Sequence, residues 1–426
     1  MPLWFSTGVA FLGSTSTHEM HTLPEKHACP CASESISGQP RARIARRIEE
    51  LEALRSFWSS CPGHRDSDLD LFLTICRTSP DVVRPHVIVL LRGGQPDAIF
   101  IGRVVFRKVA FKVGYFNVFK PRSRAILFSY GGLRGNASPA NCTAFVQEAL
   151  NCLKSGEADI AIFDHVDEHS ALFRAATGVP NILLRDNIPS LQPHWFMALP
   201  KSTEKLYASL SSNQKEHFRR TTRKLSRAFP QQIEIRTLQE PADLDKMVLD
   251  IETIASKTYQ RKLRVGFNTA PALLDFLRAE AEGKWLRIWI LYLAGRPCAF
   301  WVGAVYHLTF YSDFLGFDPS FKQHAPGIYL LSHILEALCA EGVNTVDFGF
   351  GDNAYKERIS TAAKREATLH LFAPNLRGLH LSVLRHLTSA LHEPVRALLE
   401  RSRLIGKVKK VWRQTANKTL PRTESA

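Results

Sequence analysis

The sequence predicts an α/β (α+β) protein made of two similar units in tandem, each a mixed twisted sheet flanked by helices, followed by a helical extension. Its 426 residues suffice for two domains that each bury a core. An internal repeat gives the second reason. The segments LLRGGQPDAIFIGRV (90–104) and LYLAGRPCAFWVGAV (291–305) keep Gly, Pro, Ala, Gly and Val at a constant offset of 201 residues. In each copy, two apolar runs separated by a Gly turn predict a β-hairpin.

The repeat continues downstream of both hairpins. EALNCLKSGEADIAIFD (148–164) and EALCAEGVNTVDF (336–348) each predict a helix that ends at a glycine, Gly156 or Gly342, and a buried strand after it. Because order as well as composition is kept, we expect two copies of one α/β unit. The alternative is that Gly and Pro merely recur in turns.

The elements follow in this order along the chain. Residues 1–45 are expected to be a disordered tail, 46–195 the N-terminal unit, 196–375 the C-terminal unit and 376–426 a basic amphipathic helical extension. In the C-terminal unit the apolar periodicity predicts helices at 212–229, 243–259, 271–282 and 328–340, and strands at 232–238, 307–317 and 343–350 around the repeat hairpin.

Composition limits the class of protein. The net charge of +15 suits an anionic partner: a phosphate-bearing cofactor, an anionic membrane surface or nucleic acid. No stretch approaches the roughly 18 apolar residues of a membrane span, and the start MPLWFSTGVAFLG has no basic residue before its apolar part, so we expect a cytoplasmic protein. The eight cysteines form no CxxC pair, and we expect no metal.

The helix expected at 212–229 is strongly basic. Ser211 and Gln214 have the spacing of a capping box at its start. Spacings of four place Lys215, Arg219 and Arg223 in one cationic stripe, and Arg219, Arg220 and Arg223 are candidates for contact with phosphate or substrate. A solvated basic face is an equally good interpretation.

A second candidate site lies where the loop DPSFKQHAPG meets the helix at 328. The free N–H groups and dipole of a helix start favour anions, and Lys322, Ala325 and Gly327 stand at the first, fourth and sixth places of a Q/RxxGxG/A pattern, of which only the sixth matches strictly. An ordinary helix start with Pro326 in its first turn is the alternative.

The segment VDFGFGDNAYKERIS (346–360) follows a predicted strand and carries several polar groups. Asp347, Asp352, Tyr355 and Lys356 offer a carboxylate base, a phenol acid and a cation near one strand end. The alternative is that Asp347 points to solvent and Asp352 caps the next turn.

Several short matches to known catalytic motifs lack the structural context that those motifs need. The kinase-like DFG at 347–349 lacks a glycine-rich loop before it, and the HVDEH motif at 165–169 follows a strand, whereas a zinc protease needs it on a helix. No P-loop and no GxSxG motif occurs.

Four segments of the sequence resemble a known family. The helix SSNQKEHFRRTTRKLSRA, the hairpin LAGRPCAFWVG, the segment YSDFLGFDPSFKQHAPGIYLL and VDFGFGDNAYKERIS are similar to the GNAT (Gcn-related N-acetyltransferase) fold. The likeness is to its CelD/BcsL-like (BioF-type) acetyltransferase branch, with a more distant likeness to the FemAB peptidyltransferases, which also pair two such units. It covers roughly residues 195–375.

The resemblance implies acetyl-CoA or another acyl-CoA as co-substrate. Its pantetheine arm would lie between the strands HLTFYSDF and NTVDFGF, and the pyrophosphate at Lys322, Ala325, Gly327 and Ile328. Ala325 stands where the family has a glycine.

The implied reaction is direct attack of a substrate amine on the thioester, with Asp347 or Asp352 accepting the proton and Tyr355 protonating the thiolate. Lys356 would hold an anionic group. The N-terminal unit, through FSYGGLRGN and the loop around His165, is expected to shape the acceptor side.

The C-terminal run 382–414 alternates apolar and basic residues, and predicts an amphipathic helix broken near Pro394. We expect it to pack against the C-terminal unit, with adsorption to an anionic membrane as the alternative.

The leading functional hypothesis is an acyl-CoA-dependent N-acyltransferase that acts on the amine of a small molecule or of an envelope-polysaccharide precursor. The alternatives are a FemAB-like aminoacyl-tRNA-dependent ligase that meets tRNA through the basic helix, and a non-catalytic module of the same fold in polysaccharide assembly.

Overall fold

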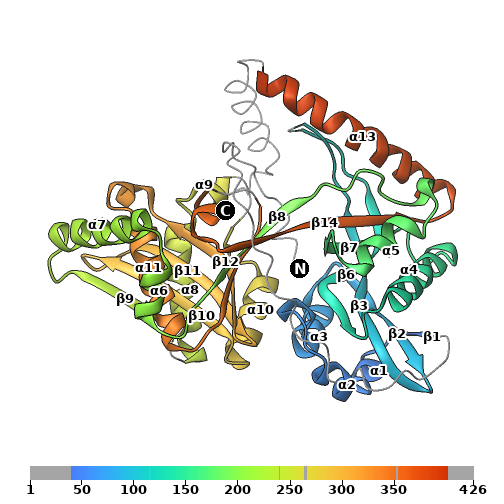
Figure 1. The fold of residues 1–426 in the computed structure, drawn as a ribbon, viewed down its shortest axis with the longest axis horizontal. Helices are drawn as coiled ribbons and strands as arrows, with labels where there is room; N and C mark the ends of the chain where they lie inside the picture. Colours follow the sequence, from blue (N-terminus) through green and yellow to red (C-terminus); the bar gives the residue numbers. More distant parts are fainter. Residues whose placement is uncertain (1–39, 115, 239, 263–265, 352–353, 402–426) are drawn as a thin grey trace, which may run out of the picture. The chain divides into compact units, whose positions relative to one another are not determined.

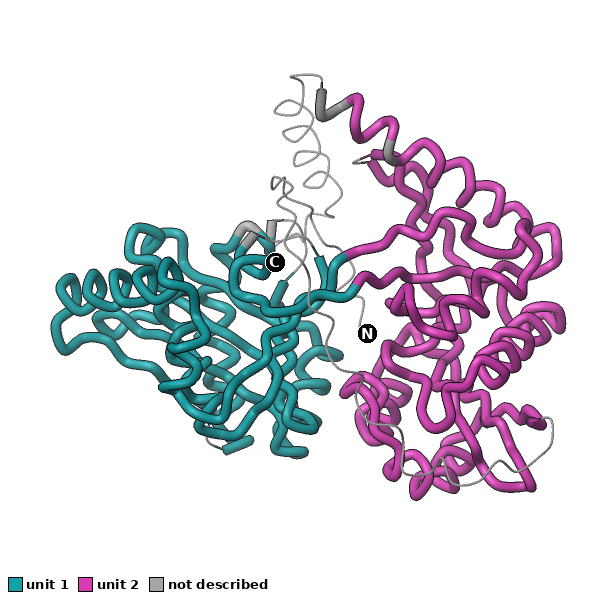
Figure 2. The backbone as a smooth tube through the Cα atoms, viewed as in Figure 1, with its two compact units in different colours: residues 1–23, 193–364 teal, residues 24–192, 365–426 magenta. Residues whose placement is uncertain are grey.

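The computed structural model describes residues 40–401, except 115, 239, 263–265 and 352–353. These residues form two compact units (Figure 2). The N-terminal unit comprises residues 40–192 and 365–401 (magenta), and the C-terminal unit comprises residues 193–364 (teal). Each unit is a mixed sheet with helices packed on it (Figure 1), as the sequence predicted.

The N-terminal unit has the strand order β1-β2-β3-β6-β7-β14, in which β6 and β7 are parallel and the other registered neighbours antiparallel. Its strands are β1 (Arg41–Ala45), β2 (Val82–Arg92), β3 (Gln95–Lys108), β6 (Arg122–Gly135), β7 (Ile160–Asp167) and β14 (Ala362–Phe372), with a separate hairpin of β4 (Phe111–Val113) and β5 (Phe116–Phe119). Its helices are α1 (Ile48–Glu52), α2 (Arg55–Ser60), α3 (Leu69–Thr78), α4 (Pro139–Lys154), α5 (Ala171–Gly178) and α13 (Leu376–Arg401), with 3-10 turns η1 (Arg65–Ser67) and η2 (Ile182–Leu184).

The C-terminal unit has the strand order β8-β13-β12-β11-β10-β9, in which β12 and β13 are parallel and the other neighbours antiparallel. Its strands are β8 (Gln192–Ala198), β9 (Ile233–Thr237), β10 (Leu286–Leu293), β11 (Arg296–Tyr306), β12 (Thr309–Phe317) and β13 (Thr345–Phe350). Its helices are α6 (Thr203–Ser209), α7 (Ser212–Ala228), α8 (Leu244–Ala255), α9 (Tyr259–Lys262), α10 (Pro271–Glu282), α11 (Pro326–Ala340) and α12 (Ala354–Ile359), with 3-10 turns η3 (Pro241–Asp243) and η4 (Pro319–His324).

Alternation along β2 explains how the N-terminal sheet is covered on both faces. Ile88 and Leu90 pack with α4 and α5, whereas Val87 and Val89 pack with α1, α2 and α3. Successive side chains of a strand point to opposite faces, so a strand covered on both sides is apolar throughout. In the C-terminal unit α6, α7 and α11 share one core with β10, β11 and β13.

The glycines matched by the repeat have corresponding conformations in the two units. The hairpins β2–β3 and β10–β11 form where predicted, and their turn glycines, Gly94 and Gly295, have φ of +82° and +72°. The helix-ending Gly156 and Gly342 have φ of +80° and +79°. These left-handed conformations favour glycine because it has no Cβ.

Two expected boundaries differ from the structure. The expected tail 1–45 ends earlier, because Arg41–Ala45 is a strand, β1, paired with β2. The C-terminal unit ends before 375, because β14 pairs antiparallel with β7 from Glu366 to Phe372. The N-terminal unit thus receives the last strand of its sheet from the far end of the chain. The remainder of the expected tail, residues 1–39, lies outside the described residues.

The C-terminal extension also differs from expectation. Helix α13 contacts β4 and η2 and belongs to the N-terminal unit, because β14 has already led the chain into that unit's sheet. The expectation that it packs on the C-terminal unit was wrong. The helix is not broken at Pro394, which lies inside it. Proline removes one backbone donor, and the remaining bonds of a long helix are enough to continue it. Residues beyond 401 lie outside the described residues.

Substituting Gly303 tests the close packing of β11 against β12. In Gly303→Ala the new Cβ would lie 2.2 Å from the carbonyl oxygen of Tyr311. Because backbone atoms must move, we expect the free energy of unfolding to fall by about 3 kcal/mol in chemical denaturation. The control Gly295→Ala has open space around its Cβ and a φ of +72°, so it should cost about 1 kcal/mol. Equal losses would contradict this account of Gly303.

Candidate functional site

The parallel strands β12 and β13 separate part-way along their length. They pair at Thr309–Thr345, Phe310–Val346 and Tyr311–Asp347, and the described residues show no register pair beyond Asp347 although both strands continue. At this point β13 has a register shift against β8, and Gly349 takes a φ of +72°. A left-handed residue cannot continue an extended ladder, so β13 turns away from β12. Among the described residues the two strands are therefore paired only at the start of β13 and diverge toward their carboxyl ends.

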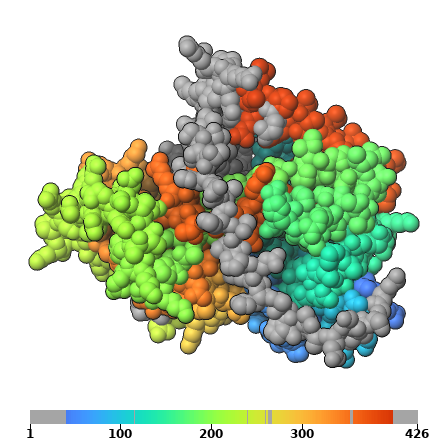
Figure 3. Space-filling view, in the orientation of Figure 1, coloured from blue at the N-terminus to red at the C-terminus, as the bar shows by residue number. Residues whose placement is uncertain are grey.

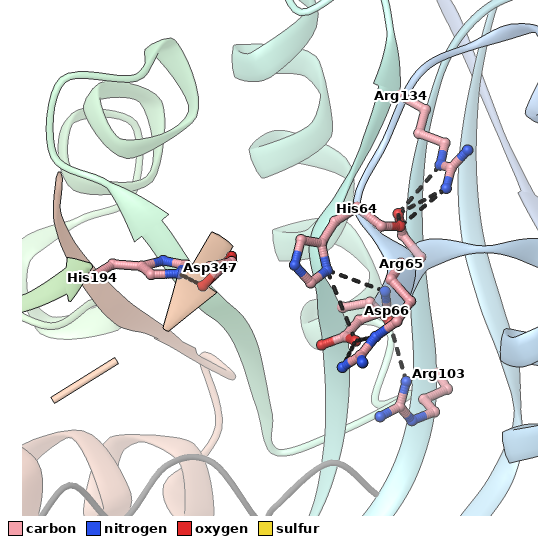
Figure 4. Close-up of polar contacts among 9 residues, drawn as sticks. His64, Arg65, Asp66, Arg103, Arg134, His194 and Asp347 are labelled. Carbon is pink, nitrogen blue, oxygen red and sulfur yellow. Dashed lines mark hydrogen bonds and ion pairs between the residues drawn. The ribbon is translucent and has the colours of Figure 1, made fainter. Parts of the chain in front are cut away.

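A buried carboxylate and a buried imidazole meet where the strands separate (Figure 4). Asp347 on β13 and His194 on β8 are 5% and 1% exposed, and their Oδ1 and Nε2 atoms are 2.6 Å apart. Asp347 Oδ1 also accepts a hydrogen bond of 2.7 Å from the backbone N–H of Gly349. The imidazole lies between the rings of Phe196 and Phe350, with centroids 4.2 and 4.1 Å away. The alternative in which Asp347 points to solvent is therefore wrong.

Helix α12 brings a third titratable group to this corner. Lys356 is buried, and its Nζ donates a hydrogen bond of 2.8 Å to the carbonyl of Phe350. Burial lowers its pKa from 10.5 to about 8, although the negative charge of Asp347 acts in the opposite direction. Tyr355 is half-buried and packs against the core of the unit. Asp352 lies outside the described residues.

The expected anion loop has a different structure from a free helix start. Residues Pro319–His324 form the 3-10 turn η4, and Ala325 adopts a left-handed conformation with a φ of +49° and a ψ of +51°. The N–H of Ala325 is bonded to Lys322 O at 3.1 Å, and that of Ile328 to Ala325 O at 3.1 Å. Among the described residues the N–H of Gly327 has no acceptor, and Lys322 is exposed. Of the groups that the sequence indicated for anion binding, the N–H of Gly327 and the ammonium of Lys322 are available, whereas the N–H groups of Ala325 and Ile328 are already bonded.

The basic helix α7 is hydrogen-bonded both to α12, which carries Lys356, and to η4, the turn before α11. Its capping box forms as predicted, with Ser211 and Gln214 bonding reciprocally. Gln214 Nε2 donates to Arg358 O on α12, and Lys224 Nζ donates to Gln323 O in η4, both at 2.5 Å. The residues predicted to contact phosphate are Arg219, Arg220 and Arg223. All three are exposed and have no ion-pair partner among the described residues.

Sequence reasoning missed His194. It lies 153 residues before Asp347 in the chain, inside an apolar strand, and only the antiparallel pairing of β8 with β13 brings the two together. A lone histidine on a strand gives no local signal of such a partner.

The N-terminal unit has its own cavity, of about 330 Å³, where β6 and β7 cease to pair. Residues 129–133 of the segment FSYGGLRGN and residues 163–167 around His165 line it, and Tyr130 OH lies 3.3 Å from Glu366 Oε1. His165 has a φ of +44° and bonds Asp164 at 2.9 Å. In Figure 4 the buried Arg134 holds the neighbouring turn by donating to the carbonyl of His64 at 3.2 Å.

One group of possible metal ligands occurs in the described part of the chain: His86, Cys152 and Glu157. Arg46 and Arg84 both form ion pairs with Glu157, and these positive charges disfavour a second cation. Burial also raises the pKa of the Cys152 thiol to about 12, which keeps it protonated. The residues present do not fit a metal.

Comparison with solved structures identifies several proteins of similar fold at low sequence identity. The structure resembles the crystal structure of FemX at 12% identity with a TM-score of 0.50, covering 78% of this chain and 97% of that chain. A conserved protein of unknown function from Bacteroides thetaiotaomicron aligns at 12% identity and a TM-score of 0.49, covering 78% of this chain and 100% of that one. A tandem GNAT protein from the clavulanic acid biosynthesis pathway aligns at 12% identity and a TM-score of 0.43, with coverages of 79% and 99%.

No curated protein matches the chain. Residues 212–357, which contain α7, the separating strands, η4 and most of α12, match the family model described as an acetyltransferase (GNAT) domain. The C-terminal unit therefore has a GNAT-type acyltransferase fold.

Proposed function

We propose that the protein is an acyl-CoA-dependent N-acyltransferase of the CelD/BcsL-like branch. It transfers an acetyl or longer acyl group to an amine of a small molecule or of an envelope-polysaccharide precursor. The observation that carries this proposal is the separation of β12 from β13 directly after the Tyr311–Asp347 pair, with a buried carboxylate at that point. Strands zipped along their whole length would leave no place for a thioester arm.

The proposal gives the donor the following place in the C-terminal unit. The thioester arm enters between the ends of β12 and β13 beyond the Tyr311–Asp347 pair, and a backbone N–H of β12 polarises the thioester carbonyl. The N–H of Gly327 and the ammonium of Lys322 then hold the diphosphate at the start of α11. Ile328 contributes packing, since its N–H is already used.

The His194–Asp347 pair takes the proton released by the acceptor. A carboxylate 2.6 Å from Nε2 selects the tautomer with the proton on Nε2, so the lone pair of the ring lies on Nδ1. The amine nitrogen attacks the thioester carbon, the carbon–sulfur bond breaks, and the amine proton passes to the imidazole, which the carboxylate stabilises. Tyr355 supplies the proton of the departing thiolate. Lys356 attracts an anionic group of the substrate below its pKa of about 8.

A second candidate donor is aminoacyl-tRNA. The exposed guanidinium groups of Arg219, Arg220 and Arg223 on α7 favour it, because an unpaired cationic face suits a phosphate backbone. The two donors are separable by experiment.

Neutralising Asp347 tests the role of the buried pair. Asp347→Asn removes the charge that stabilises the protonated imidazole, so we expect kcat to fall by about 100-fold in an assay of thiol release from acetyl-CoA with a panel of amines. Binding of acetyl-CoA, measured by calorimetry, should stay within about twofold because the arm site is intact. The control Asp245→Asn changes an exposed carboxylate of α8 and should alter neither quantity. Full activity of Asp347→Asn would refute this role, and failure of the unaltered chain to bind acetyl-CoA at millimolar concentration would refute the donor.

Removing the charge of Lys356 should change the pH dependence of stability. Because its pKa is lowered on folding, the native state binds fewer protons than the unfolded state between about pH 8 and 10.5, and its contribution to stability rises with pH over that window. Lys356→Met removes this penalty and loses one hydrogen bond, so the variant should be more stable at pH 7 by about 2 kcal/mol. The difference should shrink by pH 10.5 in chemical denaturation. A constant difference across the window would contradict a buried, pKa-shifted ammonium.

The tRNA candidate predicts a specific salt effect. Changing Arg219, Arg220 and Arg223 together to glutamine would weaken tRNA binding and reduce the slope of log affinity against log salt by about two, since each phosphate contact contributes roughly 0.7. Lys246→Gln on α8 provides an exposed control of the same charge type. If tRNA affinity and slope stay unchanged in the triple variant while acyl-CoA is consumed, the tRNA donor is excluded.

A further inference from the structure

Exposed apolar side chains gather on one part of the N-terminal unit. They lie on helix α13, on the β4–β5 hairpin and around η2, and most are more than half exposed. The residues are Leu376, Val383, Leu387, Leu391 and Leu398 on α13, Phe116, Val118 and Phe119 on the hairpin, and Ile182, Leu183 and Ile188 around η2. We call these residues together the α13 surface.

The apolar residues of α13 form a single stripe. Val383, Leu387 and Leu391 follow each other at intervals of four, so they lie on one side of the helix, and their exposed fractions are 51%, 58% and 52%. On the other side Leu381 and Thr388 are buried at 2% and 5%. The helix therefore has one face packed on the unit and a second apolar face open to solvent. Figure 3 shows α13 (red) at the molecular surface.

The elements of the α13 surface contact one another. Helix α13 packs against β4 and η2. Ser382 Oγ donates to the carbonyl of Leu183 at 2.6 Å, and Arg377 donates to the carbonyl of Arg122 at 2.8 Å. The helix, the hairpin and η2 thus form one continuous surface.

Cations accompany the apolar residues. Four exposed cations lie on or next to the hairpin: Lys108 at the end of β3, Lys112 on β4, Lys120 directly after β5 and Arg122 at the start of β6. The pKa of Lys112 lies below its usual value, because its ammonium is partly withdrawn from water and because the positive charges of Lys120 and Arg385 are near. Arg385 is bonded to Asp186, which is itself buried.

Apolar side chains in a solvent-facing stripe with cations beside them match the interface of an anionic bilayer. Leu, Val and Phe side chains reach the boundary of the acyl chains, while Lys and Arg stay at the level of the headgroups. We propose that the α13 surface docks the protein on an anionic lipid bilayer. None of the helices in the described ranges has the length and apolarity needed to cross a membrane.

A second copy of the chain fits this surface less well. A symmetric contact presents the same patch from both copies, so it would bring together two patches that each carry the positive charges of Lys112 and Lys120. A bilayer that contains anionic lipids supplies the opposite charge. This inference concerns the N-terminal unit alone and does not depend on the donor or acceptor proposed above.

Vesicle binding by the full chain tests the proposal without any substrate. We expect cosedimentation with vesicles of phosphatidylcholine and phosphatidylglycerol, much weaker association with phosphatidylcholine alone, and release on raising the salt. Leu387→Ser with Leu391→Ser should weaken binding at least about tenfold because the apolar stripe is interrupted. Lys112→Gln with Lys120→Gln should weaken it and reduce its salt dependence. All four residues are exposed, so the melting temperature should stay unchanged.

The matched control is Leu249→Ser with Leu308→Ser in the C-terminal unit. These leucines are 69% and 53% exposed, and their replacement should leave vesicle binding intact. Equal binding to neutral and anionic vesicles would overturn the proposal, as would an equal effect of the control pair. A purified chain that is dimeric, becomes monomeric in the Leu387/Leu391 variant and ignores vesicles would assign the surface to a second copy and also overturn it.

Discussion

The chemistry of the C-terminal unit depends on a backbone that stops being a strand after Asp347. Gly349 and Gly351 have φ of +72° and +102°, and neither conformation continues an extended ladder. Asp347 fixes this turn by accepting the Gly349 N–H, and the same oxygen is bonded to His194. One carboxylate oxygen thus fixes both the turn at Gly349 and the imidazole of His194. The local fold and the proposed proton acceptor are specified together.

The loop before α11 shows how a conformation can persist when its usual residue is absent. Ala325 occupies the left-handed region that a glycine would enter at lower cost, and its carbonyl accepts the N–H groups of Ile328 and Tyr329. The penalty for a residue with a Cβ is about 1–2 kcal/mol, which the helix capping and the surrounding packing offset. The diphosphate site proposed at this helix start therefore relies on the charge of Lys322 more than on a set of converging amides.

The sequence predicted what local patterns encode. The hairpins, the helix start at Ser211 and the glycine stops at Gly156 and Gly342 follow from turn chemistry and periodicity, and the structure confirms them. Strand partners at long range have no such signal. Nothing in the run 362–372 shows whether this strand joins the sheet of the C-terminal unit, which precedes it in the chain, or pairs with β7 of the N-terminal unit. The position of His194 likewise depends on a long-range pairing, that of β8 with β13. Domain boundaries and the partner of Asp347 were therefore beyond sequence reasoning.

The strand β14 has a consequence for synthesis on the ribosome. The sheet of the N-terminal unit lacks its last strand until residues 366–372 have been made, although its other strands are complete by residue 167. Until then β7 presents an unpaired edge, and such an edge can pair with other chains. In a nascent chain the edge of β7 therefore stays exposed until residue 372 has been translated. Chaperones that shield open strand edges would be needed most during that interval.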